Sequence, residues 1–420
     1  MVFQTVRGMQ DFLPERARKK QYIECVCRKV FEKYGFSPLE TPIVEEFALL
    51  AAKGSGGAAI ENEIYSFEDK GGRKLGLRFD LTVPLARVVA SNKALRLPFK
   101  RYQIGRVYRY DRPQAKRYRE FTQADIDIVG SKSVLCEFEL MAATIEIMQT
   151  LGLDFYIIIN SRPLLENLAL ACSVPKEKIA ECFRAIDKAE KLGWDESEKE
   201  LKNAKIETEI IKFLKENNLE KAEKKVKEKN LDLKGFKEIK ELFGLLKEQK
   251  LEKFAKAELS LARGLEYYTG LVFEVKLEKG PSVGGGGRYD KLIALYGGQD
   301  LPATGISFGI ERLLDSLEEK IPTVPETKVL VVPVNKAFNS GALDLTQKIR
   351  SLGINTEMDL MEKGIGKNIE YAEKKGIPFV IVIGERELKE QKFKAKELKT
   401  GKETEIAFTN LPLLRELIKD

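Results

Sequence analysis

The chain has 420 residues, of which 43% are hydrophobic and 33% charged, so we expect a folded protein of two or three domains and not a disordered chain. Its 72 Lys and Arg residues against 65 Asp and Glu give a net charge of +7, a mild excess that permits a polyanionic partner but that solubility alone also explains. Histidine is absent, which excludes a Ser-His-Asp triad, an imidazole general base and a His-ligated metal site.

The sequence gives no sign of export or membrane insertion. No run of 18 apolar residues occurs, and the N-terminus has no apolar stretch of signal-peptide length. The five cysteines are odd in number and form no CxxC pair, which favours reduced thiols. We therefore expect a cytoplasmic protein that does not bind membranes.

The N-terminal part of the chain predicts one long helix followed mainly by strands. The helix covers residues 15–34 and ends at Gly35, and an extended segment with Pro38 and Pro42 follows it. Period-2 patterns and turn residues then predict strands at 64–68, 75–79, 99–110, 118–129 and 155–160, with a polar loop at 111–117 and a helix at 136–151.

Composition changes near residue 165. From there to about residue 255 the chain is mostly Lys, Glu and Leu at helical spacing, which indicates a helical insertion with solvated charges. Strand character returns at 271–275, and a helix is predicted at 306–317 before a proline-marked linker. Beyond the linker, strands at 329–334, 356–359 and 379–383 alternate with two helical stretches, which predicts a small α/β domain.

A basic hairpin, RYDRPQAKRYREFTQ at 109–123, is the first candidate for chemistry. Two strands around the loop would bring its cations to one patch, where guanidinium groups suit phosphate oxygens. A solvated basic hairpin is an equally good interpretation. The cations are Arg109, Arg112, Lys116, Arg117 and Arg119.

Three further segments stand out. In ARGLEYY at 262–268, the two tyrosines would point to opposite faces of an extended segment, and an ordinary core or edge aromatic pair is the alternative interpretation. In SVGGGGRYD at 282–290, four glycines allow either close approach to a ligand or a flexible turn, and no P-loop motif occurs. GISFGIERLL at 305–314 predicts a strand turning into an amphipathic helix that carries Arg312.

Taken in order, these segments resemble the motifs of class II aminoacyl-tRNA synthetases, and specifically those of the histidyl-tRNA synthetase family. Thr41-Pro42-Ile43 resembles motif 1, YRYD at 108–111 with RYREF at 117–121 resembles motif 2, and residues 305–314 resemble motif 3. ARGLEYYTG and GGGGRYD resemble the two histidine-specific motifs, and LRFDLT at 77–82 also matches. The resemblance covers almost the whole chain.

The resemblance implies an α/β (α+β) fold with an antiparallel-sheet catalytic domain. Motifs 1 and 2 would lie in residues 1–164, a helical insertion in 165–255, the histidine motifs and motif 3 in 256–321, and an α/β anticodon-binding domain in 326–420. It also implies a homodimer that uses histidine, tRNA(His) and ATP with Mg²⁺, and that holds no tightly bound metal of its own.

Residue roles follow from the same resemblance. Arg263 and Arg109 would be catalytic, with Arg263 gripping the histidine carboxylate and the α-phosphate. The histidine set would be Asp80, Leu81, Thr82 and Gln123 around the amino group, Asp127 and Tyr268 at the two ends of the imidazole, and Tyr267 with Gly284, Gly285, Gly286 and Gly287 shaping the pocket. The ATP set would be Arg109, Asp111, Arg117, Phe121 and Arg312, while Arg112 and Gln114 would face the tRNA acceptor end.

This chemistry requires charge neutralisation and alignment more than a protein base, so a chain without histidine loses nothing essential. Two positions depart from the family pattern at the expected pocket rim: Thr122, where relatives often carry histidine or an aromatic residue, and Glu266, where aspartate is usual. One hypothesis for the missing histidines is autonomy, because such an enzyme can be translated when histidyl-tRNA runs out. A histidine-poor proteome or engineering would explain them equally.

Two rival functions are considered. One is a regulatory paralogue in histidine biosynthesis, which typically lacks the arginine at position 263 and the C-terminal domain. The other is a tRNA-binding accessory protein on the same scaffold. The presence of Arg109, Arg263 and Arg312 argues against the accessory protein, and Arg263 together with a C-terminal domain argues against the paralogue.

Overall fold

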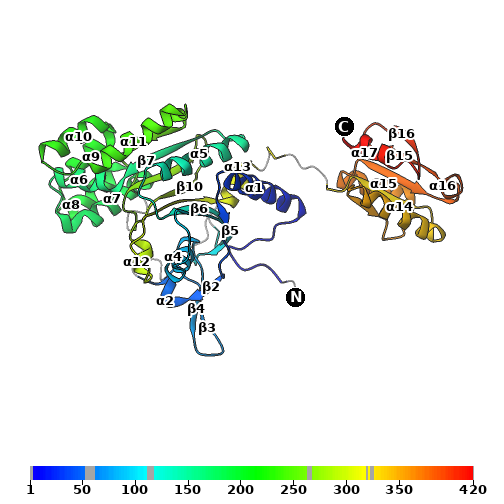
Figure 1. Ribbon diagram of the computed structural model, residues 1–420, viewed down its shortest axis with the longest axis horizontal. Coiled ribbons are helices and arrows are strands. Elements are labelled where there is room, and N and C mark those ends of the chain that lie inside the picture. Colours follow the sequence, from blue (N-terminus) through cyan, green and yellow to red (C-terminus); the bar gives the residue numbers. More distant parts are fainter. Residues whose placement is uncertain are drawn as a thin grey trace. The chain divides into compact units, whose positions relative to one another are not determined.

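The computed structural model describes residues 3–52, 62–110, 118–262, 267–317, 320–321 and 326–419. The chain divides into two compact units, Met1–Ile321 and Pro322–Asp420 (Figure 1). The domain boundaries predicted within the first unit remain a prediction. In the described part of the chain, no helix is long and apolar enough to cross a membrane.

An eight-stranded sheet forms the centre of the first unit. Its five inner pairings are antiparallel, and only the two outermost are parallel, which confirms the predicted mixed fold with a mainly antiparallel sheet. In spatial order the strands are β1 (Ser37–Pro38), β5 (Phe99–Tyr108), β6 (Glu120–Val129), β11 (Ala303–Gly309), β10 (Ser282–Arg288), β9 (Leu271–Leu277), β7 (Phe155–Ser161) and β8 (Ala255–Ala257).

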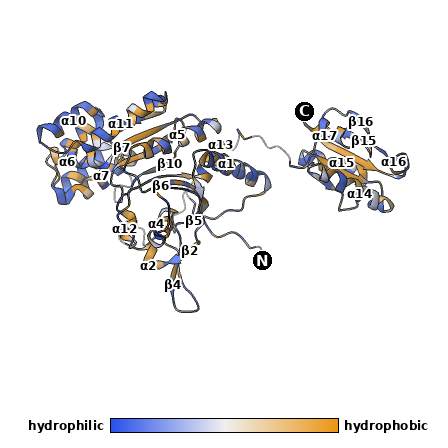
Figure 2. Cartoon of the chain, in the orientation of Figure 1, coloured by the Kyte–Doolittle hydropathy of each residue, from blue (hydrophilic) through white to orange (hydrophobic). Residues whose placement is uncertain are grey.

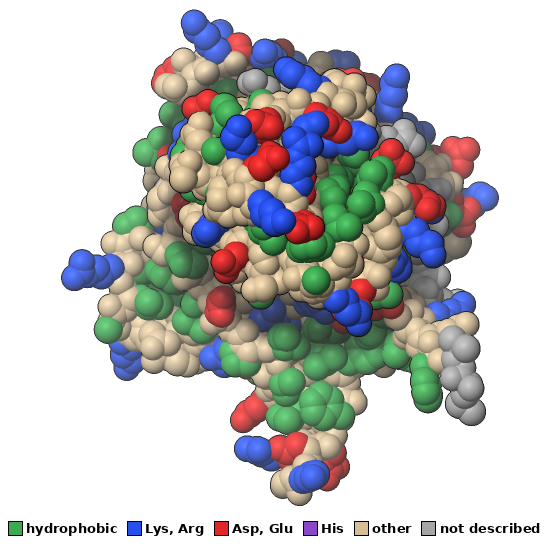
Figure 3. Space-filling model, turned by 90° about the vertical axis from the view of Figure 1, so that its right-hand side faces the viewer, with side chains coloured by type: hydrophobic (Ala, Val, Ile, Leu, Met, Phe, Trp, Pro, Cys, Tyr) green, Lys and Arg blue, Asp and Glu red, His purple; other side chains and the backbone are tan. Residues whose placement is uncertain are grey.

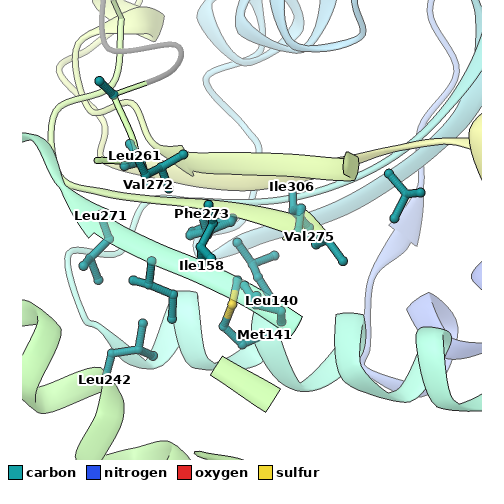
Figure 4. Close-up of a cluster of buried hydrophobic side chains, with 14 of the residues drawn as sticks. Leu140, Met141, Ile158, Leu242, Leu261, Leu271, Val272, Phe273, Val275 and Ile306 are labelled. Atoms are coloured by element: carbon teal, nitrogen blue, oxygen red, sulfur yellow. The ribbon is translucent and has the colours of Figure 1, made fainter. Parts of the chain in front are cut away.

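Helices bury one face of this sheet. Leu140 and Met141 of α5 belong to one hydrophobic cluster with Phe273 and Val275 of β9, and Leu242 approaches from the insertion (Figure 4). Burying this apolar surface supplies the main driving force for folding the unit. The helices on this side are α1 (Pro14–Lys33), α5 (Leu135–Thr150), α11 (Lys234–Glu248) and α13 (Ile310–Leu317).

Smaller elements surround the other face. A three-stranded sheet pairs in the order β2 (Val44–Glu46), β4 (Lys74–Leu77) and β3 (Ser66–Glu68). Three short helices lie nearby: α2 (Phe47–Leu50), α4 (Thr82–Ser91) and α12 (Leu292–Leu295).

The predicted helical insertion is present as a run of amphipathic helices. Their apolar faces join the same hydrophobic core as the sheet, through residues such as Leu168, Phe236 and Leu242. Hydrophilic and hydrophobic residues alternate along them (Figure 2), as partly buried helices require. Besides α11, they are α6 (Arg162–Ala171), α7 (Ile179–Leu192), α8 (Trp194–Asn203), α9 (Glu209–Glu216) and α10 (Leu219–Glu228).

The second unit has its own core and a five-stranded sheet in the order β13 (Thr356–Met358), β12 (Val329–Pro333), β14 (Phe379–Ile383), β15 (Lys392–Glu397) and β16 (Glu403–Ala407). The first three strands are parallel and match the predicted strands, and β15 and β16 add a hairpin. The helices are α14 (Asn339–Ser351), α15 (Ile365–Lys375), α16 (Glu385–Glu390) and α17 (Pro412–Lys419).

Two local predictions were wrong. Of the two interpretations of the glycine run, the flexible turn is wrong, because the four glycines form the middle of β10 and pair with a strand on each side. Residues 306–309 belong to β11, and the helix begins only at Ile310. In the glycine run, pairing with neighbouring strands overrides the weak strand propensity of glycine, and residues 306–309 pair with β6 and β10.

Candidate active site

A cavity of about 940 Å³ opens over the face of the sheet opposite the helices, between β6, β9, β10 and β11. It brings together most of the described residues that the sequence singled out, from segments more than 200 residues apart. These are Asp80, Thr82, Arg109, Phe121, Gln123, Asp127, Tyr267, Tyr268 and Arg312, with Gly284, Gly285 and Gly286.

Leu81 differs from its neighbours. Its side chain is fully buried and does not line the cavity, while its backbone oxygen accepts a hydrogen bond from Arg101 at 3.2 Å. Leu81 therefore contacts the support of the cavity and not its interior. The predicted residues Asp111, Arg112, Gln114, Arg117 and Arg263, and also Glu266, lie outside the described residues.

Strand β6 supplies one wall through its period-2 alternation. Phe121, Gln123, Asp125 and Asp127 line the cavity, while Ala124 and Ile126 face the hydrophobic core. Thr122 shares the core-facing side, so the expectation that it touches the pocket rim was wrong. Its hydroxyl accepts a hydrogen bond from Lys20 of α1 at 2.7 Å, and its backbone N–H donates to Glu311 of α13 at 2.8 Å.

The inner end of the cavity is built around Asp127. Arg101, directly opposite on β5 and 0% exposed, pairs with the Asp127 carboxylate at 2.6 Å, and the Tyr289 hydroxyl also donates to it. Burial raises the pKa of Asp127, and the Arg101 guanidinium opposes that rise. The carboxylate is thus fixed in position by two partners that lie behind it.

Tyr267 and Tyr268 do not point to opposite faces as expected. They lie in a turn before β9, with ring centroids 4.2 Å apart, and the Tyr267 hydroxyl donates to the Tyr268 hydroxyl at 2.8 Å. An extended segment would have separated them, whereas the turn brings both rings to the cavity. Burial raises the pKa of both hydroxyls, so they stay protonated at neutral pH.

Two glycines, one in β10 and one in β11, leave no room for a side chain. A Cβ at Gly286 would lie 2.0 Å from the backbone oxygen of Gly305, and a Cβ at Gly305 would lie 1.9 Å from the Asp127 carboxylate. Any side chain at these two positions would displace the strands or the carboxylate.

Arginines and an aromatic ring mark another part of the cavity. The Arg109 Nε donates to the backbone oxygen of Phe79 at 3.0 Å, and its guanidinium lies over the Phe121 ring, 5.2 Å from the centroid. Arg312 is exposed and donates to the backbone oxygen of Ser282 at 3.0 Å. Phosphate oxygens would find fixed cationic donors here.

A second carboxylate of the cavity, that of Asp80, lies at the start of α4. Oδ1 of Asp80 accepts a hydrogen bond from the backbone N–H of Val83 at 3.0 Å, so the helix N-terminus orients it. Burial raises the pKa of Asp80, while this hydrogen bond and the charge of Arg109 lower it.

Sequence reasoning missed Asp125, Arg101 and Tyr289. The signal for Asp125 was available, because Gln123 and Asp127 fix which face of β6 lines the cavity and Asp125 lies between them. Arg101 could be found only from the register between β5 and β6, and Tyr289 only from its long-range contact with Asp127.

Comparison with known proteins assigns the chain to a family. Residues 8–313 match the model for histidyl-tRNA synthetase, and residues 328–414 match that for an anticodon-binding domain. The chain is 36% identical to a protein named histidine–tRNA ligase 2 from Shouchella clausii, covering 97% of this chain and 99% of that one. It is 37% identical to the histidine–tRNA ligase of Helicobacter pylori, covering 94% and 93%.

The fold agrees with these sequence matches. The crystal structure of histidyl-tRNA synthetase from a Nostoc species superposes with a TM-score of 0.86 at 32% identity, covering 100% of this chain and 99% of that one. Together with the match over most of the first unit, this similarity shows that the chain belongs to the histidyl-tRNA synthetase family of histidine–tRNA ligases.

Proposed function

We propose that the cavity activates histidine with ATP, using the residues that the sequence assigned to each substrate. The supporting observation is the uneven charge of the cavity, with Asp80, Asp125 and Asp127 among its walls and Arg109 and Arg312 elsewhere in it. A zwitterionic amino acid and a polyphosphate require this combination, whereas a simple anion-binding patch has no need of buried carboxylates.

The histidine ring would lie between Asp127 and Tyr268. Asp127 is held by Arg101 and Tyr289, so it can accept from a ring N–H without moving, and the Tyr268 hydroxyl can bind the other ring nitrogen. Asp80, Thr82 and Gln123 would receive the amino group. A site that binds both ring nitrogens rejects amino acids lacking them, because its own polar groups would be left unpaired.

In the first step, a carboxylate oxygen of histidine attacks the α-phosphorus of ATP, the bond to the β-phosphate oxygen breaks, and pyrophosphate leaves. In the second, the terminal ribose hydroxyl of tRNA attacks the histidyl carbonyl carbon, and AMP leaves. Arg263 and Arg109 would neutralise charge that shifts onto the α-phosphate, which is the main requirement of such a transfer.

Mg²⁺ would enter with ATP as part of the substrate. The described residues contain no group of three acidic or cysteine side chains able to hold a metal alone. We propose that phosphate oxygens bind most of the ion, and Glu274 on the cavity wall is one carboxylate within the site. The ion would neutralise phosphate charge.

The tRNA would contact both units. The anticodon-binding domain in the second unit would hold the anticodon arm, and Arg112 and Gln114 would face the acceptor end. We further propose a cytoplasmic homodimer that includes motif 1, beside which Ile43, Val44 and Phe67 expose 40–44% of their surface. Sedimentation of the purified chain at two concentrations tests the dimer.

Aminoacylation measured beside ATP–pyrophosphate exchange tests this function and separates the rivals. A ligase catalyses histidine-dependent exchange and also attaches labelled histidine to tRNA(His). The regulatory paralogue and the accessory protein would do neither, although the accessory protein would still retain tRNA on a filter. Absence of both activities in a folded chain would refute the proposal.

A further inference from the structure

Asp125 is a cavity residue to which no substrate role has been given so far. It lies on β6 between Gln123 and Asp127, lines the cavity, and is only 2% exposed. Among the described residues its Oδ1 has no hydrogen-bond partner, and neither has Oε1 of Gln123. Because leaving a buried acceptor unpaired is costly, two such oxygens on one wall indicate that a bound molecule supplies the donors.

The surroundings of Asp125 favour a cation. Asp127 pairs with Arg101, but within the described residues neither Asp80 nor Asp125 forms an ion pair. The Ser307 hydroxyl accepts from Nε2 of Gln123 at 2.7 Å and also hydrogen-bonds Asp125, so a single serine fixes both side chains. The charged and titratable groups that interact with Asp125 are Arg101 and Arg78, Asp127, Asp80 and Tyr268.

We propose that Asp125 is the counter-ion for the α-ammonium group of the bound amino acid, beside the acceptors Asp80, Thr82 and Gln123. This inference rests on the proposed function of the cavity. An ammonium group presents three N–H donors on one nitrogen and so suits several acceptors, whereas each nitrogen of an imidazole offers at most one donor. In the proposed function, Asp127 and Tyr268 already bind the two nitrogens of the imidazole ring.

Binding should therefore displace a proton. In the empty cavity, burial raises the pKa of Asp125 to about 7, helped by the charges of Asp127 and Asp80 and opposed by Arg101. An arriving ammonium favours the carboxylate, so the carboxyl proton leaves to solvent while the ammonium keeps its three protons. Histidine binding near neutral pH then releases more protons from the wild type than from Asp125→Asn.

Calorimetry with two ligands tests the assignment. Wild type and Asp125→Asn are titrated with histidine and with imidazole-4-propionate, which keeps the ring and carboxylate but lacks the ammonium. The variant should bind histidine about 10- to 100-fold more weakly, because a charge-assisted hydrogen bond is lost. Its affinity for imidazole-4-propionate should be unchanged or higher. Equal weakening toward both ligands, or toward neither, overturns the proposal.

Repeating the histidine titration near pH 7 in two buffers of different ionisation enthalpy gives the number of protons released. The histidine ring contributes equally in both proteins, so the difference between wild type and Asp125→Asn reports Asp125. Ser307→Ala is the matched control, because it removes the shared hydroxyl but keeps the carboxyl. Its proton release should stay closer to that of the wild type, and a loss equal to that in Asp125→Asn contradicts the counter-ion role.

Thermal unfolding of each variant shows that the protein titrated is folded. Pyrophosphate exchange by the wild type distinguishes a failure of the proposed function from a failure of the role given to Asp125. If the wild type shows no histidine-dependent exchange, the proposed function itself fails. If it does show exchange but Asp125→Asn binds histidine normally, only the role of Asp125 is refuted.

Discussion

The cavity and the helical insertion use the same charged residue types in opposite ways. In the cavity, Arg101 and Asp127 pair at 0% and 4% side-chain exposure. On the insertion, Lys240 and Glu223 pair between α11 and α10 at 55% and 24% exposure, and similar pairs cover neighbouring helices. Buried charges are retained at a cost in desolvation, whereas exposed pairs mainly keep the surface hydrated.

The face drawn in Figure 3 follows the second pattern. It shows Lys and Arg side chains interspersed with Asp and Glu (Figure 3). If burial determines how much a charged side chain contributes, substitutions in the cavity should have larger effects than substitutions on the insertion.

Arg101→Met should have the largest effect on stability. It leaves the Asp127 carboxylate buried without its cation, which destabilises a folded protein by about 3–5 kcal/mol. Chemical denaturation monitored by circular dichroism measures the loss. Adding Asp127→Asn removes the unpaired charge and should restore much of the stability. A double variant as unstable as the single one would show that Arg101 acts through packing instead.

Arg263→Ala should lower kcat for adenylate formation by about 100-fold or more, with little change in the histidine KM, because its contact strengthens only in the transition state. Pre-steady-state exchange kinetics measure both constants. A variant altered only in KM would show that Arg263 binds histidine without taking part in the chemistry.

Asp127→Ala should weaken histidine binding by about 1–3 kcal/mol, since a ring N–H is left unpaired in a closed site. The histidine KM should rise while the ATP KM stays constant. Unchanged histidine affinity in the folded variant would remove Asp127 from the recognition set.

Asp125 should make the stability of the ligand-free protein depend on pH. Its folded-state pKa of about 7 lies above the ordinary value of 3.8, so between these values the folded protein binds more protons than the unfolded chain. Stability from this group therefore falls as pH rises from about 4 to about 7. Compared with Asp125→Asn, the wild type should lose stability over that range in thermal unfolding, and parallel curves would contradict the buried titration.

Lys240→Ala should have the smallest effect, between about 0 and 1 kcal/mol, because its pair with Glu223 lies at the surface. Denaturation at low and high salt measures it. A loss as large as that of Arg101→Met would mean that exposure does not distinguish the two regions.

The sequence predicted the order and type of most elements because their periodicity is local. It also identified one face of β6, since Gln123 and Asp127 lie four residues apart on a strand. It could not predict that Arg101 lies opposite Asp127, because that depends on the register across a hairpin loop. Nor could it place the glycine run inside β10, where the close approach of Gly305 determines which residue fits.

The hairpin of β15 and β16 was not predicted from the sequence. Its Lys392 and Lys394 each pair across the hairpin, with Glu405 and Glu403 at 3.0 Å. Deleting residues 326–420 still tests the role of the whole unit. A folded, dimeric truncation should keep pyrophosphate exchange and lose aminoacylation, whereas equal loss of both would argue against a separable tRNA role.

Histidine-dependent ATP–pyrophosphate exchange by the purified full-length chain tests most directly whether the buried charges of the cavity recognise and activate histidine. Exchange is measured with ATP, Mg²⁺ and each of the 20 standard amino acids in turn. The account predicts exchange with histidine and background rates with the other amino acids. A folded chain that shows no exchange, or exchanges equally well without histidine, would contradict it.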